Sequence, residues 1–410
     1  MNGEESKAPL LVDLFCGAGG LVTGFASVGF ETVLASDIWI PAAETYQCNH
    51  PGHRFVQSDI RDLDLVDELK EFQGCRPLVI AGGPPCQGFS SAGARSANDE
   101  RNTLVSVYAK RALSVDPDVI VFENVEGFLT AEGGKFVLDL LAPLVEAGYK
   151  VRLEKLNVAN FGVPQLRKRV IAIAAKRKIP VPLQISTMAF GMPGADLLAR
   201  DKPNVKGIIE YLQQFQIDSE SDSLSEVRRL SGIEYERVSL IPQGGTMKDL
   251  PEELQHKSWG TRANRRVRDG IVTEKRGGAP VGIRRLKATD PSKAITSAAT
   301  REFIHPEENR MLTLREAALL QTFPVNYEFV GNKSEIATLI GNAIPPVFAA
   351  VLGKAVKETL SADMVTDTNG GIVELSLTNS TGMSPALART QKLITANIPD
   401  LSNPAVERLF

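Results

Sequence analysis

Cysteine and histidine are scarce in this chain, which contains four of each among its 410 residues. The cysteines show no Cys-x-x-Cys spacing, and His50 and His53 flank only a Pro-Gly turn, so the sequence predicts no metal site. Four cysteines are also too few for a disulfide framework in a chain of this length, which is typical of proteins from a reducing compartment.

Strong net charge and long apolar runs are missing as well. The formal net charge is −3, and 43% of the residues are hydrophobic and 23% charged, as in an ordinary globular protein. The polar residues 1–7 lack the apolar core of a signal peptide, and we expect no run long enough to span a membrane. The sequence therefore predicts a soluble cytoplasmic protein of two or three domains, without a membrane partner, in which any basic surface is local.

The stretch Leu78–Ser90 carries the strongest functional signal. A short apolar run, typical of a buried strand, breaks on two glycines and is followed by Pro84, Pro85 and Cys86. Ligands bind beyond the carboxyl ends of strands in open α/β sheets, so the thiol would lie at the rim of a site on a loop stiffened by proline. On this stretch alone, Cys86 is either a placed nucleophile or a small buried apolar residue.

A second apolar run, residues 9–15, ends in the glycine-rich segment Cys16–Gly20 and leads into a helical pattern. Strand, glycine turn and helix open a nucleotide-binding α/β unit. The dinucleotide spacing fails because Val22 stands where a third glycine is needed, which disfavours a dehydrogenase. Asp37 and Asp59 end the next two apolar runs, so we predict an adenosine-type cofactor whose ribose binds an acid at a strand end.

Two later segments carry further polar candidates. Glu123 ends a buried-strand run, and its carboxyl group either caps the following helix or holds a proton for a substrate. Gln165, Arg167 and Arg169 share one face of an extended segment at a period of two, where they could grip a phosphate and a base edge. A solvated basic strand is the alternative for this second group.

From about residue 179 to 279 the alternation of strands and helices is lost. Residues 260–287 hold nine basic side chains against two acidic ones. Such a local basic strip is typical of a contact with a phosphate backbone, although a solvated loop has the same composition.

Six segments occur in the order that is characteristic of DNA cytosine-5 methyltransferases, and the chain resembles that family. The matching segments are Asp13–Gly20, Gly83–Ser90, Glu123–Val125, Gln165–Arg169, the block from Arg285 to Pro324, and Gly341–Pro346. They cover roughly residues 9–178 and 284–358, and they leave out the irregular middle, where the family keeps its target-recognition region.

The resemblance implies an α/β fold, namely a Rossmann-like S-adenosylmethionine-dependent methyltransferase domain with a smaller, irregular target-recognition domain. It implies a catalytic and cofactor-binding domain over residues 1–178, a target-recognition small domain and hinge over 179–324, and a return to the catalytic domain over 325–360. Residues 361–410 are not covered, show no readable pattern, and form an extension of unknown role.

The resemblance also implies the chemistry. The thiolate of Cys86 would add to C6 of a cytosine, Glu123 would hold a proton on N3, and C5 would take a methyl group from S-adenosyl-L-methionine. Gln165, Arg167 and Arg169 complete the catalytic set, with Arg167 directed towards the base and Arg169 towards structure or phosphate. The target base must be flipped out, because none of this can occur inside a stacked duplex.

For the cofactor, the resemblance implies a pocket that is assembled from several loops. Phe15, Gly17 and Gly19 would lie at the methionine end, Asp37 would bind the ribose, and Ile38 would lie against the adenine. The residue after the ribose acid is often aromatic in this family, whereas here it is Ile38, and Trp39 comes one position later. Asp59 and Ile60 would lie at the edge of the adenine, and Pro84, Leu104 and Asn342 would close the pocket.

The main interpretation is a monomeric DNA (cytosine-5-)-methyltransferase of a prokaryotic restriction-modification system, acting on double-stranded DNA. Its cognate restriction endonuclease would be a functional partner rather than a physical one. A tRNA cytosine-5 methyltransferase would use the same motifs, and a non-catalytic DNA-binding regulator could keep the fold. The long middle segment favours a reader of duplex DNA, and the intact Cys86, Glu123 and Arg167 argue against a regulator.

Overall fold

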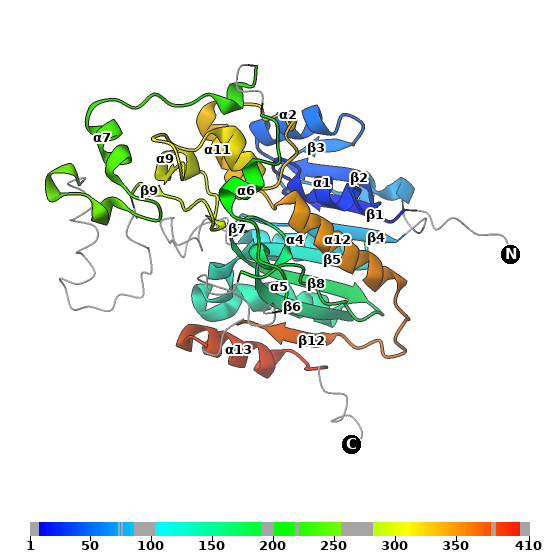
Figure 1. Ribbon diagram of the computed structural model, residues 1–410. Helices are drawn as coiled ribbons and strands as arrows, with labels where there is room; N and C mark the ends of the chain where they lie inside the picture. The colour runs from blue at the N-terminus through cyan, green and yellow to red at the C-terminus, as the bar shows by residue number, and fades with distance from the viewer. Residues whose placement is uncertain are drawn as a thin grey trace.

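A mixed β-sheet forms the centre of the molecule (Figure 1). The computed structural model describes residues 8–72, 74, 77–85, 103–189, 201–217, 221–255, 282–378 and 383–401. Within them the large sheet has eight strands in the order β12-β6-β8-β5-β4-β1-β2-β3. These strands are β1 (Leu10–Leu14), β2 (Glu31–Asp37), β3 (Phe55–Gln57), β4 (Leu78–Gly82), β5 (Val119–Val125), β6 (Tyr149–Asn157), β8 (Lys168–Lys176) and β12 (Gly371–Ser376).

Every strand of this sheet except β8 runs in the same direction. Strands β1 to β5 pair in parallel, β8 is antiparallel to both β5 and β6, and β12 is parallel to β6. Strands β6 and β8 form an antiparallel hairpin. The carboxyl ends of all the other strands therefore share one edge, where open α/β sheets bind their ligands.

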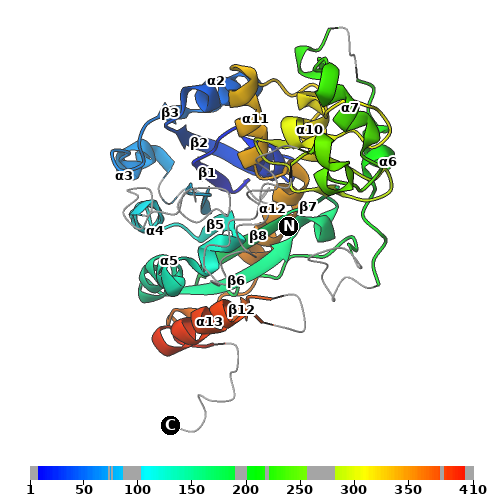
Figure 2. The same ribbon diagram turned by 90° about the vertical axis from the view of Figure 1, so that its left-hand side faces the viewer.

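Helices cover both faces of the sheet (Figure 2). They are α1 (Gly20–Ala26), α2 (Ile40–Asn49), α3 (Leu65–Glu68), α4 (Leu104–Leu113), α5 (Lys135–Glu146), α12 (Pro346–Ser361) and α13 (Pro385–Asn397). One face packs against α4, α5 and α13, and the other against α1 and α12. Since β1 and β4 lie between these layers, they are buried along their whole length. The predicted Rossmann-like α/β fold is confirmed.

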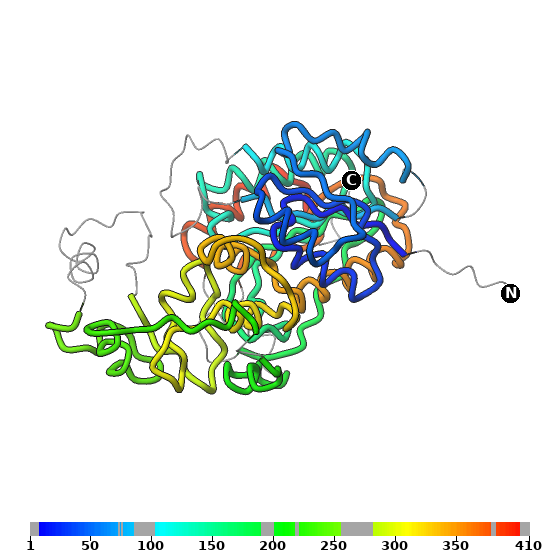
Figure 3. The backbone as a smooth tube through the Cα atoms, turned by 90° about the horizontal axis from the view of Figure 1, so that it is seen from above, coloured from blue at the N-terminus to red at the C-terminus, as the bar shows by residue number. Residues whose placement is uncertain are grey.

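A second lobe, made of the described residues between 201 and 342, gathers on one side of the molecule (Figure 3). Its helices are α6 (Ile208–Leu212), α7 (Gly232–Leu240), α9 (Ala299–Glu302), α10 (Leu314–Leu320) and α11 (Lys333–Asn342). Short strand pairs join β7 (Gln165–Leu166) to β10 (Ser292–Lys293) and β9 (Arg284–Arg285) to β11 (Phe303–Ile304). The main apolar cluster of this lobe reaches Ala18 in the glycine loop, so the lobe is anchored beside the functional edge of the sheet.

The C-terminal extension, for which no element was expected, belongs to the first lobe. Strand β12 pairs with β6 and extends the sheet, and α13 packs against the same face as α5. The sequence does not reveal these elements because β12 is an edge strand without alternating burial and α13 buries only Leu387, Thr390 and Ile394. The role of the extension is therefore to complete the sheet and its apolar core.

We expect an Ile394→Ala variant to lower the free energy of unfolding by about 2 to 5 kcal/mol, the usual cost of truncating a fully buried isoleucine. Ile394 is 0% exposed in the apolar core under α13. Thr395→Ala is the matched control. Thr395 is the exposed neighbour of Ile394 on the same helix, so its substitution should change the stability little. Urea denaturation of both variants measures the difference, and equal stabilities would show that α13 does not pack as described.

One stretch, Lys333–Ser361, is long and apolar enough by composition to cross a membrane, contrary to the expectation from sequence. In the structure it is two helices, α11 and α12, which are separated between Ala343 and Pro345. Of the most apolar 18-residue segment of this stretch, 67% is buried inside the protein. The apolar composition of this stretch is thus explained by its place in the cores of both lobes.

Candidate active site

A cavity of about 900 Å³ opens at the carboxyl edge of the sheet, within the size range of small-molecule sites. It is lined by the loops that follow β1 to β5 and by two segments outside the sheet, around Thr296 and Gly341. Gly19 and Gln165 do not line it, and Cys86 lies outside the described residues. The predicted residues that do line it are Phe15, Gly17, Asp37, Ile38, Asp59, Ile60, Pro84, Leu104, Glu123, Arg167, Arg169 and Asn342.

The loop after β1 turns through left-handed backbone at Phe15, Gly17 and Gly19, where φ is 60°, 52° and 79°. A Cβ built at Gly17 would meet no atom within 4 Å, so the loop leaves open space there for a ligand. Gly19 was also expected at the methionine end, which stays a prediction, but the side-chain position of Gly19 faces protein. A Cβ at Gly19 would lie 3.0 Å from both His50 Nε2 and Tyr327 Oη, on the side of the loop that packs against protein.

Asp37 ends β2, and its carboxylate lines the cavity. Its Oδ2 accepts a hydrogen bond from the backbone N–H of Gly17 and its Oδ1 from that of Trp39, both at 2.9 Å. These bonds orient the two oxygens, and each keeps a lone pair for a ligand. Burial raises the pKa of Asp37, while the hydrogen bonds from Trp39, Gly17 and Ile38 act in the opposite direction.

The pKa of Asp37 is raised, so this side chain takes up a proton at a higher pH than an ordinary aspartate does. We therefore expect the binding of a ribose-containing ligand to weaken at a higher pH as the solution is acidified. A carboxylate accepts both ribose hydroxyls only when it is ionised, so the dissociation constant should rise as the pH falls through this pKa. Titration calorimetry with an adenosine ligand between about pH 8 and pH 4 measures the effect. An Asp37→Asn variant should bind about 10-fold more weakly at neutral pH, and a similar rise with acid in that variant would rule Asp37 out.

The far end of the cavity is more apolar. Ile38 is 60% exposed on its wall, and Trp39 lines the same space, so an aliphatic and an aromatic side chain both follow Asp37. Arg111 from α4 donates to the backbone carbonyls of Ile60 and Arg61 and so fixes the loop after β3. These contacts give the loop a defined shape next to Asp59, although no sequence motif points to Arg111.

Sequence reasoning missed several residues that line the cavity. Some lie inside or next to the matching segments, or next to predicted residues, but were given no role, and they could have been found by taking each segment whole with one position on either side: Ala18, Gly20, Leu21, Ser58, Arg61 and Asn124. Others come from the second lobe: Ala294, Thr296 and Ser297 in the block from Arg285 to Pro324, and Thr338 outside any matching segment. Only the three-dimensional arrangement brings this last group to the site.

Glu123 and Arg169 form an ion pair on one wall of the cavity. Arg169 Nε lies 2.5 Å from Glu123 Oε1, and each side chain is 12% exposed. Glu123 Oε2 faces Gly83, because a Cβ built at Gly83 would lie 2.9 Å from it. Asn124 donates from Nδ2 to the carbonyl of Pro84 at 3.1 Å and ties the end of β5 to the same loop. The carboxyl group therefore lies beside the loop that begins at Gly83.

Gln165 and Arg167 bind the backbone N–H and the backbone carbonyl of Ile295, respectively. Gln165 Oε1 accepts from the Ile295 N–H at 3.0 Å, and Arg167 donates to the Ile295 carbonyl at 2.7 Å. Arg167, which is 2% exposed, also donates to the carbonyl of Gly341 at 2.8 Å. Both side chains therefore fix backbone segments that form the wall of the cavity.

The contacts of the two arginines differ from those expected, and their roles towards the base and the phosphate stay predictions. Arg167 was expected to point towards the base and Arg169 towards structure or phosphate, but Arg169 meets Glu123 and Arg167 meets backbone carbonyls. The period of two fails because the chain leaves regular strand geometry between β7 and β8, at Arg167 itself.

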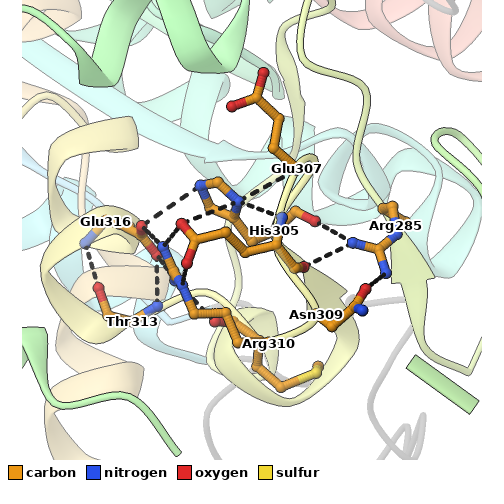
Figure 4. A network of polar contacts seen from close by, with 9 residues as sticks. Arg285, His305, Glu307, Asn309, Arg310, Thr313 and Glu316 are labelled. Carbon is orange, nitrogen blue, oxygen red and sulfur yellow. Dashed lines mark hydrogen bonds and ion pairs between the residues drawn. The ribbon is translucent and has the colours of Figure 1, made fainter. Parts of the chain in front are cut away.

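Arg285 does not belong to the basic surface that was predicted for residues 260–287. It is 5% exposed, and its guanidinium donates to the carbonyls of Val238, Ile241 and His305 at 2.6, 2.7 and 2.9 Å. It joins the end of α7 to the turn that precedes α10, and Figure 4 shows its contacts with that turn. Residues 256–281 lie outside the described residues, so the phosphate contact of the strip stays a prediction.

The same turn is closed by a second arginine. Arg310 Nη2 lies 2.7 Å from Glu316 Oε1 (Figure 4). Glu316 also accepts from the backbone N–H of Thr313, whose hydroxyl accepts from the Glu316 N–H in return. Thr313 and Glu316 thus form a capping box, which fixes the start of α10.

Comparison with protein families identifies the family to which this chain belongs. The family model described as C-5 cytosine-specific DNA methylase matches residues 10–358. The chain belongs to this family. The predicted membership is thereby confirmed, and β12 and α13 lie beyond the matched range.

Individual relatives agree with this family. The chain is 32% identical over 349 residues to the Type II methyltransferase M1.HphI of Haemophilus parahaemolyticus, covering 84% of this chain and 86% of the relative. It is 31% identical to the Type II methyltransferase M.Sau96I of Staphylococcus aureus, covering 88% and 78%. A solved Escherichia coli prophage protein shares 25% identity with a TM-score of 0.59, covering 87% of this chain and 100% of the other.

Proposed function

We propose that the protein transfers a methyl group from S-adenosyl-L-methionine to C5 of a cytosine flipped out of a specific duplex DNA sequence. The observation that carries this proposal is one cavity that joins two kinds of site in a chain of this family. Asp37 and the open glycine loop lie in one part of it, and the Glu123–Arg169 pair lies in another, beside the loop that leads to Cys86.

The residues present fit the cofactor. Asp37 offers two oriented carboxylate oxygens for the ribose hydroxyls, and Ile38, Ile60 and Leu104 offer apolar surface for an adenine ring. The space at Gly17 accommodates the methionine end, because no atom fills the place of a side chain there. When bound, the cofactor supplies an electrophilic methyl group.

The protein's own residues would activate the cytosine, whose C5 is a poor nucleophile. The Cys86 thiolate forms a bond from Sγ to C6, and Glu123 holds a proton on N3 as negative charge develops in the ring. C5 then takes the methyl group, its proton leaves, and the bond from Sγ to C6 breaks to release Cys86. Arg169 orients the carboxyl group of Glu123, since its guanidinium holds Oε1 and leaves Oε2 facing the Cys86 loop.

The names of the relatives support a proposal for the biological setting. Several are named Type II methyltransferases, a class of restriction-modification enzyme. We propose that this chain likewise acts in the cytoplasm as a monomer and protects host DNA from a cognate endonuclease, which need not touch it. The second lobe would carry the sequence recognition, with phosphate contacts from the basic strip.

Methyl transfer from radiolabelled S-adenosyl-L-methionine tests the proposal directly. We expect incorporation into duplex DNA and none into tRNA, with 5-methylcytosine as the product after hydrolysis. Bisulfite sequencing of DNA from a host that expresses the chain would then give the recognition sequence. Incorporation into tRNA alone would instead establish the tRNA methyltransferase, and no incorporation into either would support a non-catalytic protein.

A further inference from the structure

A cluster of polar rings supports the glycine loop from the side opposite the cavity. His50 follows α2, Tyr327 follows α10, and Thr23 belongs to α1, so three separate parts of the chain contribute to it. The sequence singled out His50 only as part of a turn and assigned Tyr327 no role. Gly19 is the loop residue that packs directly on His50 and Tyr327.

Two successive carbonyls of the glycine loop are held by this cluster. The Tyr327 hydroxyl donates to the carbonyl of Ala18, and the Thr23 hydroxyl donates to that of Gly19 at 2.8 Å. Each hydroxyl hydrogen is thereby committed to the loop. His50 Nε2 lies 3.2 Å from Tyr327 Oη and 3.5 Å from Thr23 Oγ1. This nitrogen must therefore carry the hydrogen and donate to the two hydroxyl oxygens.

A second histidine holds the first in place. The rings of His50 and His53 stack at 5.1 Å with an angle of 12° between their planes, and Tyr46 Oη lies 2.9 Å from His53 Nδ1. Burial, and then the neighbouring His53, lower the pKa of His50 to about 4, and burial lowers that of His53 as well. The phenols of Tyr46 and Tyr327 stay protonated, because burial first and then Cys16 and Asp13 raise the pKa of both.

We propose that His50 and Tyr327 are positioning residues for the cofactor, which hold the glycine loop in the conformation that leaves space at Gly17. This inference rests on the proposed function, because it assigns support to the same binding site. Neither residue lines the cavity, so each acts only through the backbone of Ala18 and Gly19. Without the hydrogen bonds from this cluster, a smaller fraction of molecules has the glycine loop in the conformation that binds the cofactor. The apparent affinity for the cofactor falls in proportion to that fraction.

The main test compares two tyrosine-to-phenylalanine variants. Tyr327→Phe removes the hydroxyl but keeps the aromatic ring, whose centroid lies 4.7 Å from that of the Phe323 ring. Tyr149→Phe is the matched control, because Tyr149 is also buried and also donates to a backbone carbonyl, that of Pro117, at the opposite edge of the sheet. We expect Tyr327→Phe to raise the dissociation constant and the KM for S-adenosyl-L-methionine by about 5- to 20-fold. Its kcat and its KM for DNA should stay within about two-fold, and Tyr149→Phe should leave all four within about two-fold.

Substitutions of His50 provide an independent test. His50→Gln keeps a side-chain N–H that can reach Tyr327, whereas His50→Leu offers none. We expect His50→Leu to weaken cofactor binding as Tyr327→Phe does, and His50→Gln to recover most of the affinity. Circular dichroism at the assay temperature shows which variants are folded. If His50→Leu is unfolded, the comparison of His50→Gln with the wild type still tests the inference.

The outcomes separate the inference from the function on which it rests. If the wild type itself binds no S-adenosyl-L-methionine in calorimetry, the proposed function fails. If the wild type binds and folded Tyr327→Phe binds equally well, the positioning role is overturned. An equal loss of affinity in Tyr149→Phe and Tyr327→Phe would also overturn it, since a general loss of stability would then explain both.

Discussion

A Cys86→Ser variant should lose methyl transfer almost completely, with kcat reduced by at least about 10³-fold. A serine hydroxyl is far less ionised than a thiol near neutral pH, so the addition to C6 that activates the cytosine would not occur. Cofactor affinity should change little, because Asp37 and the glycine loop lie on other strands. Cys48→Ser is the matched control, since Cys48 is an exposed cysteine of α2 and should be dispensable.

The same pair of variants can be examined with a substrate that traps the intermediate. Duplex DNA that carries 5-fluorocytosine at the target has no C5 proton to lose, so the bond between Sγ and C6 cannot break after methyl transfer. We expect the wild type and Cys48→Ser to form an adduct that survives denaturing electrophoresis, and Cys86→Ser to form none. Full activity of Cys86→Ser would remove this residue from the mechanism.

Arg169→Met and Arg167→Met should separate catalysis from stability. We expect Arg169→Met to lower kcat by about 10²-fold or more, because Glu123 would lose the guanidinium that orients its carboxyl group. Arg167→Met should instead lower the free energy of unfolding by about 3 kcal/mol or more. Its guanidinium is buried against the carbonyls of Ile295 and Gly341, which would be left without this donor.

Urea denaturation and steady-state methylation measure the two quantities on the same samples. Arg169→Lys is a useful companion variant, since it keeps the charge beside Glu123 but not the planar guanidinium, and partial activity would show that charge contributes. If Arg167→Met were as stable as the wild type and inactive, Arg167 would act on the base, as the family resemblance had implied. The assignment of Arg169 to Glu123 would then lose its functional meaning.

Asp37 and Glu123 could be predicted because an acid at the end of an apolar run reaches the functional edge of any parallel sheet. That inference needs only the order of strands and turns along the chain. The glycine loop is local in the same way, and Gly17 and Gly19 in it adopt the left-handed backbone that glycine favours. What local patterns do not give is the side of the loop on which each glycine faces.

The roles of Arg167 and Gln165 could not be predicted because their partners are distant in sequence. Both bind backbone groups of Ile295, about 130 residues further along the chain. The hydrogen bonds of Arg285 are equally non-local, so it was counted as a surface cation although it is buried. Composition records charge, but only packing decides whether a cation meets solvent or backbone carbonyls.

The reversed direction of β8 has a consequence for how such enzymes can diverge. Because β8 opposes β5, Arg169 near its beginning stands across from Val125, one diagonal step from Glu123 on the same sheet face. Neither partner comes from the second lobe, so the register between β5 and β8 alone sets the relative positions of the Glu123 carboxyl group and the Arg169 guanidinium. New target sequences can therefore be acquired by exchanging surface segments while the reactive pair stays in alignment, whereas a slip of one residue between these strands would turn Arg169 to the other face.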